Sequence, residues 1–258
     1  MKYAIVNDEK REAERGLSGT CPICEVPVKP RCGRIRVPHW YHPPGIFDHH
    51  WEPETEWHRN WKGLFPKECQ EVCHRAENGE RHLADVKTAH GMVLEFQNSQ
   101  ISEEERTSRE AIYRPLMCWM VNGLARKNDR QKFIAALRLG QIVQGNPMSI
   151  AVPTANCVLL RKWENSGTLV LFDFGENEEE GDPVRFNAPV LWAMRPESPK
   201  GAILMPVLRA RFVDAMLKNE PLIGINFAAN VPPATARQHL VFQLPPTPWM
   251  RRRRSRRF

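Results

Sequence analysis

Two acidic residues lie inside short apolar runs, and this placement is the strongest constraint that the sequence puts on the fold. Asp85 follows Leu-Ala and precedes Val, and Glu95 lies in the run Val-Leu-Glu-Phe-Gln. The apolar runs predict strands over residues 82–88 and 92–98, with an Ala-His-Gly turn between them at 89–91. Because burying an unpaired charge is costly, both acids need a partner in the folded protein.

The predicted hairpin brings the two acids to facing positions. If the turn centres on His90, Asp85 faces Glu95 across the ladder. Side chains alternate along a strand, so Gln97 shares a face with Glu95, and Lys87 shares a face with Asp85. Facing carboxylates repel, and a divalent cation such as Mg²⁺ (or Mn²⁺) would relieve the repulsion. The alternative interpretation is a surface hairpin whose acids are solvated or neutralised by Lys87 or a nearby arginine.

The elements around the hairpin follow in the order helix, three strands, helix, strand. A helix is predicted over residues 54–65, because a proline stands on either side and apolar residues recur on one face. A strand over 69–75 precedes the hairpin. A capping box that begins at Ser102 predicts a helix to about Tyr113, and an apolar strand over 117–121 follows.

Cysteines and histidines near the N-terminus have the spacing of a zinc site. Cys21-Pro-Ile-Cys24 is followed by His39-Trp-Tyr-His42. The pattern is typical of tetrahedral Zn²⁺ held by two thiolates and two imidazoles. Because the protein would fill all four positions, we expect the site to be structural. The alternative is free cysteines and ordinary histidines.

Further residues compete for these ligand positions, because Cys32 lies between the two pairs and His49 and His50 follow them. The chain has 7 cysteines and no apolar segment typical of a signal peptide near its start, which favours metal ligation or core packing over disulfides. We therefore expect a reducing, cytoplasmic compartment. The module could also present Arg34 and Arg36 to nucleic acid, the alternative being a solvated edge.

The basic charge of the chain is concentrated at its end. The tail 251–258 is Arg-Arg-Arg-Arg-Ser-Arg-Arg-Phe, and without its arginines the formal net charge of +7 would be close to neutral. Such a tail binds polyanions by releasing counterions, although it could equally be a solvated end with no specific role. No apolar run is long enough to span a bilayer, so we expect no membrane partner.

The chain divides into four parts by composition. Short apolar runs over 151–250 alternate with Pro and Gly and predict strands plus one helix near 210–218. The expected parts are a Cys/His zinc-binding module (1–50), a central core (51–150), a C-terminal α+β region (151–250) and an Arg-rich tail (251–258).

The motifs of the central part resemble those of a known family. In chain order they are His82-Leu-Ala-Asp85-Val, Val93-Leu-Glu95-Phe-Gln97-Asn-Ser99, Ser108-Arg109-Glu110, Tyr113 and Trp119-Met-Val-Asn-Gly123. This series resembles the CoiA-like competence proteins, which belong to the PD-(D/E)XK nuclease superfamily. The upstream helix motif Glu54-Thr55-x-x-His58-x-x-x-Lys62 and the Cys-Pro-x-Cys … His-x-x-His stretch are similar to that family as well.

The resemblance implies an α/β fold of the PD-(D/E)XK type, with a mixed sheet flanked by helices, a small zinc-binding module before it and an α+β region after it. It implies that Asp85 and Glu95 bind Mg²⁺. Gln97 stands where the superfamily usually has Lys, and it would position water or a phosphate oxygen by hydrogen bonds. Glu54 and His58 would complete the catalytic pocket.

On this basis we expect a cytoplasmic, Mg²⁺-dependent nuclease that hydrolyses phosphodiester bonds in DNA, in DNA uptake, DNA processing or phage defence. Lys62, Lys87 and Arg109 are candidate DNA contacts, although Arg109 could instead pair with Glu105. The alternative is a zinc-containing DNA-binding protein that keeps the nuclease fold without cutting, and Gln97 in place of Lys supports it. A third hypothesis makes the C-terminal region a module for protein partners.

Overall fold

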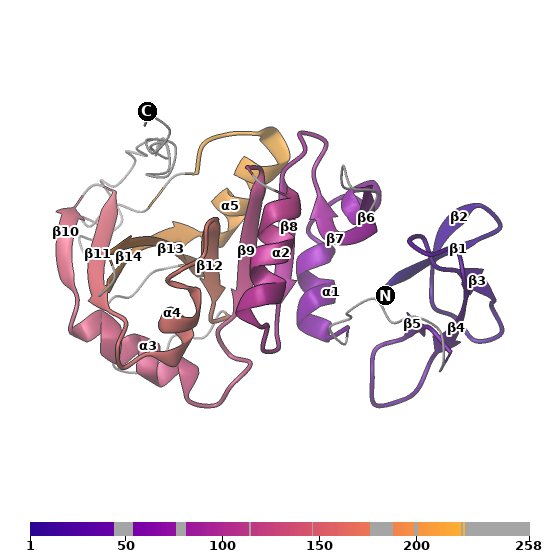
Figure 1. Ribbon diagram of the computed structural model, residues 1–258, viewed down its shortest axis with the longest axis horizontal. Helices are drawn as coiled ribbons and strands as arrows, with labels where there is room; N and C mark the ends of the chain where they lie inside the picture. Colours follow the sequence, from indigo (N-terminus) through magenta and orange to yellow (C-terminus); the bar gives the residue numbers. More distant parts are fainter. Residues whose placement is uncertain are drawn as a thin grey trace, which may run out of the picture.

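Two β-sheets organise the chain (Figure 1). The structure is a computed structural model that describes residues 1–43, 54–75, 81–113, 115–145, 147–175, 188–198, 201–222 and 224. The Arg-rich tail, the alternative ligands His49 and His50, and most of the acidic loop at 175–182 lie outside the described residues.

The larger sheet is mixed and has nine strands in the order β10-β11-β14-β13-β12-β9-β8-β7-β6. Its strands are β6 (Gln70–Arg75), β7 (Arg81–Lys87), β8 (Val93–Gln97), β9 (Met117–Asn122), β10 (Gln141–Gly145), β11 (Met148–Pro153), β12 (Leu169–Asp173), β13 (Val190–Ser198) and β14 (Gly201–Leu208). The central strands β8, β9 and β12 run parallel, so their carboxyl ends meet at one edge. The other neighbouring strands described in this sheet pair antiparallel.

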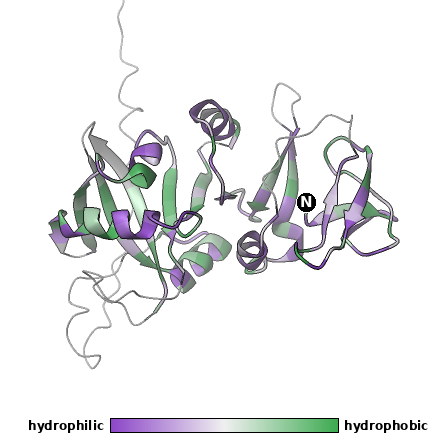
Figure 2. Ribbon diagram, turned by 90° about the horizontal axis from the view of Figure 1, so that it is seen from below, coloured by the Kyte–Doolittle hydropathy of each residue, from purple (hydrophilic) through white to green (hydrophobic). Residues whose placement is uncertain are grey.

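Helices cover both faces of the large sheet and bury two apolar layers. One layer contains residues of α2 (Glu103–Tyr113), α3 (Asp129–Arg138) and α4 (Val158–Trp163), and the other contains residues of α1 (Glu56–Lys62) and α5 (Arg209–Lys218). A short 3₁₀ helix (Lys67–Cys69) leads into β6. Figure 2 shows apolar residues concentrated on the central strands beneath amphipathic helices. No helix in the described part of the chain is both long and apolar enough to cross a bilayer.

The smaller sheet is built by the N-terminal residues and lies beside the β6 end of the large sheet (Figure 1). Its order is β2-β1-β3-β4-β5, formed by β1 (Tyr3–Val6), β2 (Glu9–Glu12), β3 (Gly19–Thr20), β4 (Pro27–Arg31) and β5 (His39–Tyr41). A separate small core holds it together, with Ala4, Cys21, Val28 and Trp40 buried in it. A core of this size supplies little stability on its own, which gives a metal ion a structural purpose there.

The predicted central elements are confirmed in order and type. Helix α1, strands β6, β7 and β8, helix α2 and strand β9 follow one another as expected. The hairpin pairs Val86 with Leu94 and Lys87 with Val93, which is the register expected for a turn at His90. The Ser102 side chain accepts a hydrogen bond from the Glu105 backbone N–H at 3.1 Å, as the capping box requires.

The C-terminal region differs from the prediction in two respects. Residues 158–160, expected as an apolar strand, begin helix α4, because Leu159, Leu160 and Trp163 are buried at helical spacing. Apolar runs this short do not distinguish a strand from a buried helix. The large sheet also continues across the expected boundary at residue 150, since β11 to β14 belong to the same sheet as β6 to β9.

Gly123, which follows β9, provides a test of how closely the chain packs against the ring of Phe174. A side chain at this position would overlap the ring of Phe174, which packs at 4.5 Å between centroids against Phe133. We expect Gly123→Ala to lower the free energy of unfolding by about 1–3 kcal/mol, measured by denaturant unfolding. The control is Gly33→Ala, because a Cβ there would meet no heavy atom within 4 Å. Equal unfolding midpoints for the two variants would contradict the packing at Gly123.

Candidate functional site

Three acidic residues lie at one level across three neighbouring strands. Gln70 pairs with Val86 and Val72 with Ala84, which places Glu71 of β6 opposite Asp85 of β7. The pairing of Val86 with Leu94 likewise places Glu95 of β8 at the position that faces Asp85. The backbone at Glu71 has φ 46°, a left-handed conformation that is unfavourable for a residue with a side chain.

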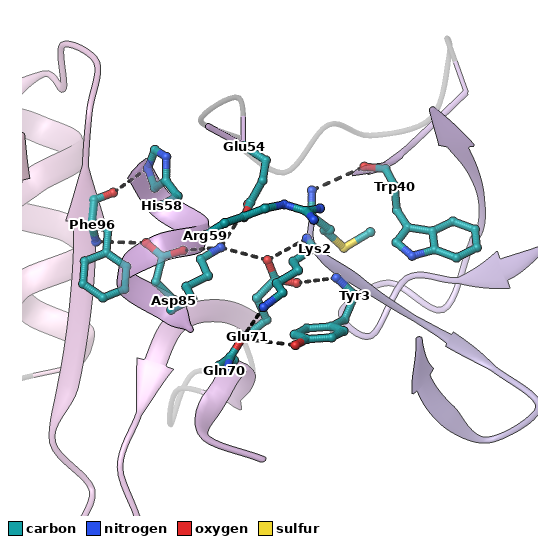
Figure 3. Close-up of polar contacts among 12 residues, drawn as sticks. Lys2, Tyr3, Trp40, Glu54, His58, Arg59, Gln70, Glu71, Asp85 and Phe96 are labelled. Atoms are coloured by element: carbon teal, nitrogen blue, oxygen red, sulfur yellow. Dashed lines mark hydrogen bonds and ion pairs between the residues drawn. The ribbon is translucent and has the colours of Figure 1, made fainter. Parts of the chain in front are cut away.

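Asp85 holds β8 through its side chain where the backbone ladder opens. The described pairing of β7 with β8 ends at Val86, and the Asp85 Oδ2 accepts a hydrogen bond from the Phe96 backbone N–H at 2.9 Å (Figure 3). The Phe96 carbonyl lies 3.1 Å from His58 Nε2 on the neighbouring helix. Asp85 and His58 therefore fix the backbone of β8 at Phe96, one through the N–H group and the other through the carbonyl group.

His58 has a different position from the one expected of a proton-transfer residue. Its side chain is buried, and its Nδ1 lies 2.7 Å from the Thr55 hydroxyl in the capping box of α1. Because both ring nitrogens are engaged within the protein, the structure makes His58 a residue that positions β8 rather than an accessible acid or base.

Lys62 is the central cation of the site. Its Nζ lies 3.0 Å from Glu54 Oε2, 2.9 Å from Glu71 Oε1 and 3.0 Å from Asp85 Oδ1. Burial alone would lower the pKa of Lys62, but the charges of the three carboxylates outweigh it and raise the pKa well above its usual value. The expected role of Lys62 as a DNA contact is wrong, because the side chain is 3% exposed and enclosed by acids.

Glu71 joins the two sheets and was not expected from the sequence. Its Oε1 accepts a hydrogen bond from the Lys2 backbone N–H at 2.8 Å and its Oε2 from the Tyr3 backbone N–H at 2.9 Å (Figure 3). Burial raises the pKa of Glu71, but the charge of Lys62 and the hydrogen bond from Lys2 help to lower it to about 2. From the sequence, the place of Glu71 beside Asp85 could have been found only by pairing β6 with β7 in the correct register.

Glu95, like Glu54, has one buried carboxylate oxygen that forms no hydrogen bond with a described residue. Its Oε2 pairs with Arg109 Nη1 at 3.0 Å, whereas its Oε1 is buried without a hydrogen-bond partner among the described residues. Burial, and then the charge of Asp85, raise the pKa of Glu95 to about 8, although Arg109 opposes the shift. The register of the hairpin places Asp85 and Glu95 at facing positions, as the sequence predicts.

Two of the other expected cations face carboxylates or histidine rather than solvent. Arg109 pairs with Glu105 at 2.6 Å as well as with Glu95, so the predicted salt bridge to Glu105 is confirmed and the guanidinium is already engaged. Lys87 Nζ lies 3.2 Å from His74 Nδ1, and no carboxylate in the described ranges pairs with it. Lys87 therefore does not neutralise the two hairpin acids.

Gln97 lies two residues beyond Glu95 on β8 and is buried. Its Nε2 donates a hydrogen bond to the Ser99 carbonyl at 3.3 Å, and its side chain lines a cavity at the end of the strand. Gln97 is thus placed to contact a group that enters this cavity.

A second group lies in the N-terminal sheet. The ligand atoms of Cys21, Cys24 and His42 lie within 4.8 Å of one another, and Cys24 Sγ is 3.3 Å from His42 Nε2. These three residues could hold a metal ion. Burial raises the pKa of the Cys21 thiol to about 11, because a lone thiolate is unfavourable in this core.

His39 and Cys32 do not join this group. His39 lies in β5, where its Nδ1 is 2.9 Å from the Val37 carbonyl, and the Cys32 thiol donates a hydrogen bond to the Ala13 carbonyl at 3.4 Å. His39 lies within β5 and His42 just after it, and His42 is the one that brings a ring nitrogen to the two thiols. The expected ligand set is therefore corrected to three residues, without His39.

Comparisons with models of known protein families, with curated proteins and with solved structures find no match for this chain. The function is therefore inferred from the acidic cluster around Lys62, from the Cys/His group and from the cavity at Gln97.

The raised pKa of Glu95 predicts that stability depends on pH when no divalent cation is added. A carboxyl group with a higher pKa in the folded protein contributes stability below its unfolded value, 4.5, and loses it as the pH rises through about 8. We expect the free energy of unfolding of the wild type to fall relative to that of Glu95→Gln between about pH 5 and about pH 8. Denaturant unfolding across this range measures the difference.

The exposed acid Glu9 supplies the control for this measurement. Glu9→Gln should follow the wild type at every pH, since its charge is solvated in both states. Parallel stability profiles for the wild type and Glu95→Gln would contradict a raised pKa at Glu95.

Proposed function

We propose that this chain is a metal-dependent nuclease that hydrolyses phosphodiester bonds in DNA. The observation that carries the proposal is the row formed by Glu71, Asp85 and Glu95 on neighbouring strands. The order helix, three strands, helix, strand around this row matches what the resemblance to the CoiA-like proteins implies. The large mixed sheet flanked by helices is compatible with a PD-(D/E)XK fold.

The acidic cluster is suited to a hard divalent cation. Carboxylate oxygens are the ligands that Mg²⁺ and Mn²⁺ prefer, and the buried Glu95 Oε1 lacks a partner among the described residues. Asp85 and Glu95 would hold the ion, which would supply Lewis acidity and an activated water. Lys62 would supply the positive charge that Gln97 cannot, and it neutralises Glu54 and Glu71.

A second candidate function is a DNA-binding protein that keeps this fold without cutting. The observation that favours it is the position of Lys62, whose ammonium already forms ion pairs with three of the four carboxylates, where a metal ion would otherwise bind. The loop between β4 and β5 also exposes Arg34, Ile35 and Arg36, and Ile35 is 99% exposed. Exposed arginines beside an apolar side chain are a common means of contacting DNA grooves.

Cleavage of DNA with Mg²⁺ or Mn²⁺ separates the two candidates. We expect the wild type to cut DNA, and Asp85→Asn or Glu95→Gln to lower the rate by about 10²-fold or more because each removes a charged ligand. Plasmid nicking and cleavage of labelled single-stranded DNA measure the rates, with circular dichroism to check the fold.

The matched control is again Glu9→Gln, which removes an exposed carboxylate and should cut at the wild-type rate. Wild-type protein that binds DNA in a gel-shift assay but cuts neither substrate would overturn the nuclease proposal and support the second candidate.

We also propose that Cys21, Cys24 and His42 bind a structural zinc ion. Two thiolates and an imidazole are a donor set typical of zinc, and they supply three of the four ligands of a tetrahedral site. The group lies in the small N-terminal core beside Ile23 and Trp40, where a metal ion would compensate for limited apolar burial.

Metal analysis of the purified protein tests this site. We expect about one zinc ion per chain in the wild type and a loss of zinc in Cys24→Ser, since a hydroxyl does not replace a thiolate ligand. Cys73→Ser is the control, because Cys73 is exposed on β6 and belongs to no group of clustered ligands among the described residues. Equal zinc contents in the two variants would contradict the assignment.

A further inference from the structure

A cavity of about 260 Å³ opens at the carboxyl ends of β8 and β9. Gln97 and Val121, which pair in the parallel ladder, lie in its wall together with residues from the loops after both strands and from the end of α4. In open α/β sheets, ligands bind in crevices outside the carboxyl ends of parallel strands. The cavity therefore occupies a position that is suited to a ligand.

Three cations that form no ion pair with a described carboxylate line this cavity. They are Arg126, Arg161 and Lys162. Arg161 donates a hydrogen bond to the Ala155 carbonyl at 3.2 Å, and Lys162 donates one to Gln100 Oε1 at 3.1 Å. No described carboxylate forms an ion pair with any of the three, in contrast to Lys62 and Arg109.

Two acids also lie in the wall, and Asp129 offsets part of the positive charge. Glu103 pairs with Arg106 at 3.8 Å, and Asp129 forms no ion pair with the three cations. Burial, and then the charge of Arg126, lower the pKa of Lys162, whereas the charge of Asp129 raises it. An anion between them would relieve their repulsion.

The cavity continues the line of the acidic cluster along β8. Glu95 and Gln97 are two residues apart and share one face of the strand, so their side chains are about 7 Å apart along it. This separation is comparable with that of consecutive phosphates in a nucleic-acid strand. If the scissile phosphate of a strand lay beside the acidic cluster, its neighbouring phosphate would lie near Gln97 in the wall of the cavity.

We propose that the cavity binds the phosphate of one nucleotide in a nucleic-acid strand, next to the bond at the acidic cluster. The volume is at the small end of ligand pockets, and it is suited to a single nucleotide rather than a duplex. The statement that this phosphate lies next to a bond that is cut rests on the proposed nuclease function. Binding of the phosphate itself depends only on the three cations. A free nucleotide carries the same phosphate chemistry, and the experiment distinguishes it from a strand.

Calorimetric titration of the full chain without added divalent cation tests binding separately from cleavage. The probes are thymidine, thymidine 5′-monophosphate and a short single-stranded oligothymidylate. We expect the oligonucleotide to bind the wild type and the monophosphate to bind more weakly, while thymidine, which lacks the phosphate, shows no binding. The double variant Arg126→Gln, Lys162→Gln should weaken oligonucleotide binding by about tenfold for each cation removed.

The salt dependence provides a readout that a general loss of folding would not produce. Each cation that contacts a phosphate contributes about one unit to the slope of log affinity against log salt, so the double variant should lower the slope by about two. Lys127→Gln is the matched control, because Lys127 follows Arg126 in the chain, is exposed and does not line the cavity. Circular dichroism melting checks that all variants fold.

Two results would overturn the proposal. One is oligonucleotide affinity that is unchanged in the double variant, and the other is binding of the monophosphate without binding of the oligonucleotide, which would indicate a free nucleotide as the ligand. Failure of the nuclease proposal has a different signature, namely DNA that binds with the expected salt dependence and stays intact when Mg²⁺ or Mn²⁺ is added.

Discussion

The buried ammonium of Lys62 is the interaction on which the acidic cluster depends. Glu54, Glu71 and Asp85 come from a loop and two strands, and each places a carboxylate oxygen within 3.0 Å of this one nitrogen. Carboxylates buried this closely are unstable without a counter-charge, and removing one partner of such a network costs about 3–5 kcal/mol. Helix α1 is therefore held against the sheet by charge as well as by Trp61, which is fully buried.

The same network connects the N-terminal sheet to the rest of the protein. Glu71 accepts hydrogen bonds from two consecutive backbone amides of the first strand region, while its Oε1 also contacts Lys62. Glu71 makes these contacts from an unfavourable backbone conformation with φ 46°. Because backbone strain of order 1–3 kcal/mol persists only where surrounding contacts compensate for it, the two sheets form one interdependent site.

The opening of the ladder between β7 and β8 has a consequence for function. Where backbone pairing stops, the side chain of Asp85 takes over the Phe96 N–H, and Glu95 keeps one buried oxygen without a partner in the described structure. A regular ladder would leave less freedom for the side chains that flank it. Glu95, Gln97 and the cationic cavity then follow one another along β8, and this is the line along which we propose that a nucleic-acid strand binds.

Local patterns in the sequence predicted much of the central region. Alternation and turn residues predicted the hairpin and its register, and the capping box predicted the start of α2. These features depend on neighbours in the chain, so periodicity and capping chemistry are sufficient to find them.

Contacts between distant segments were decided only by the tertiary structure. The place of Glu71, the burial of Lys62 and the exclusion of His39 from the Cys/His group depend on which strands pair and which face each side chain occupies. The cavity cations come from the loop after β9 and from α4, a helix whose short apolar run resembles a strand in sequence. The spacing of residues in the sequence determines which of them can share a helix or strand. The order of the strands and the burial of each side chain determine which distant residues come into contact. Strand order and burial depend on the free energy of the whole packed chain.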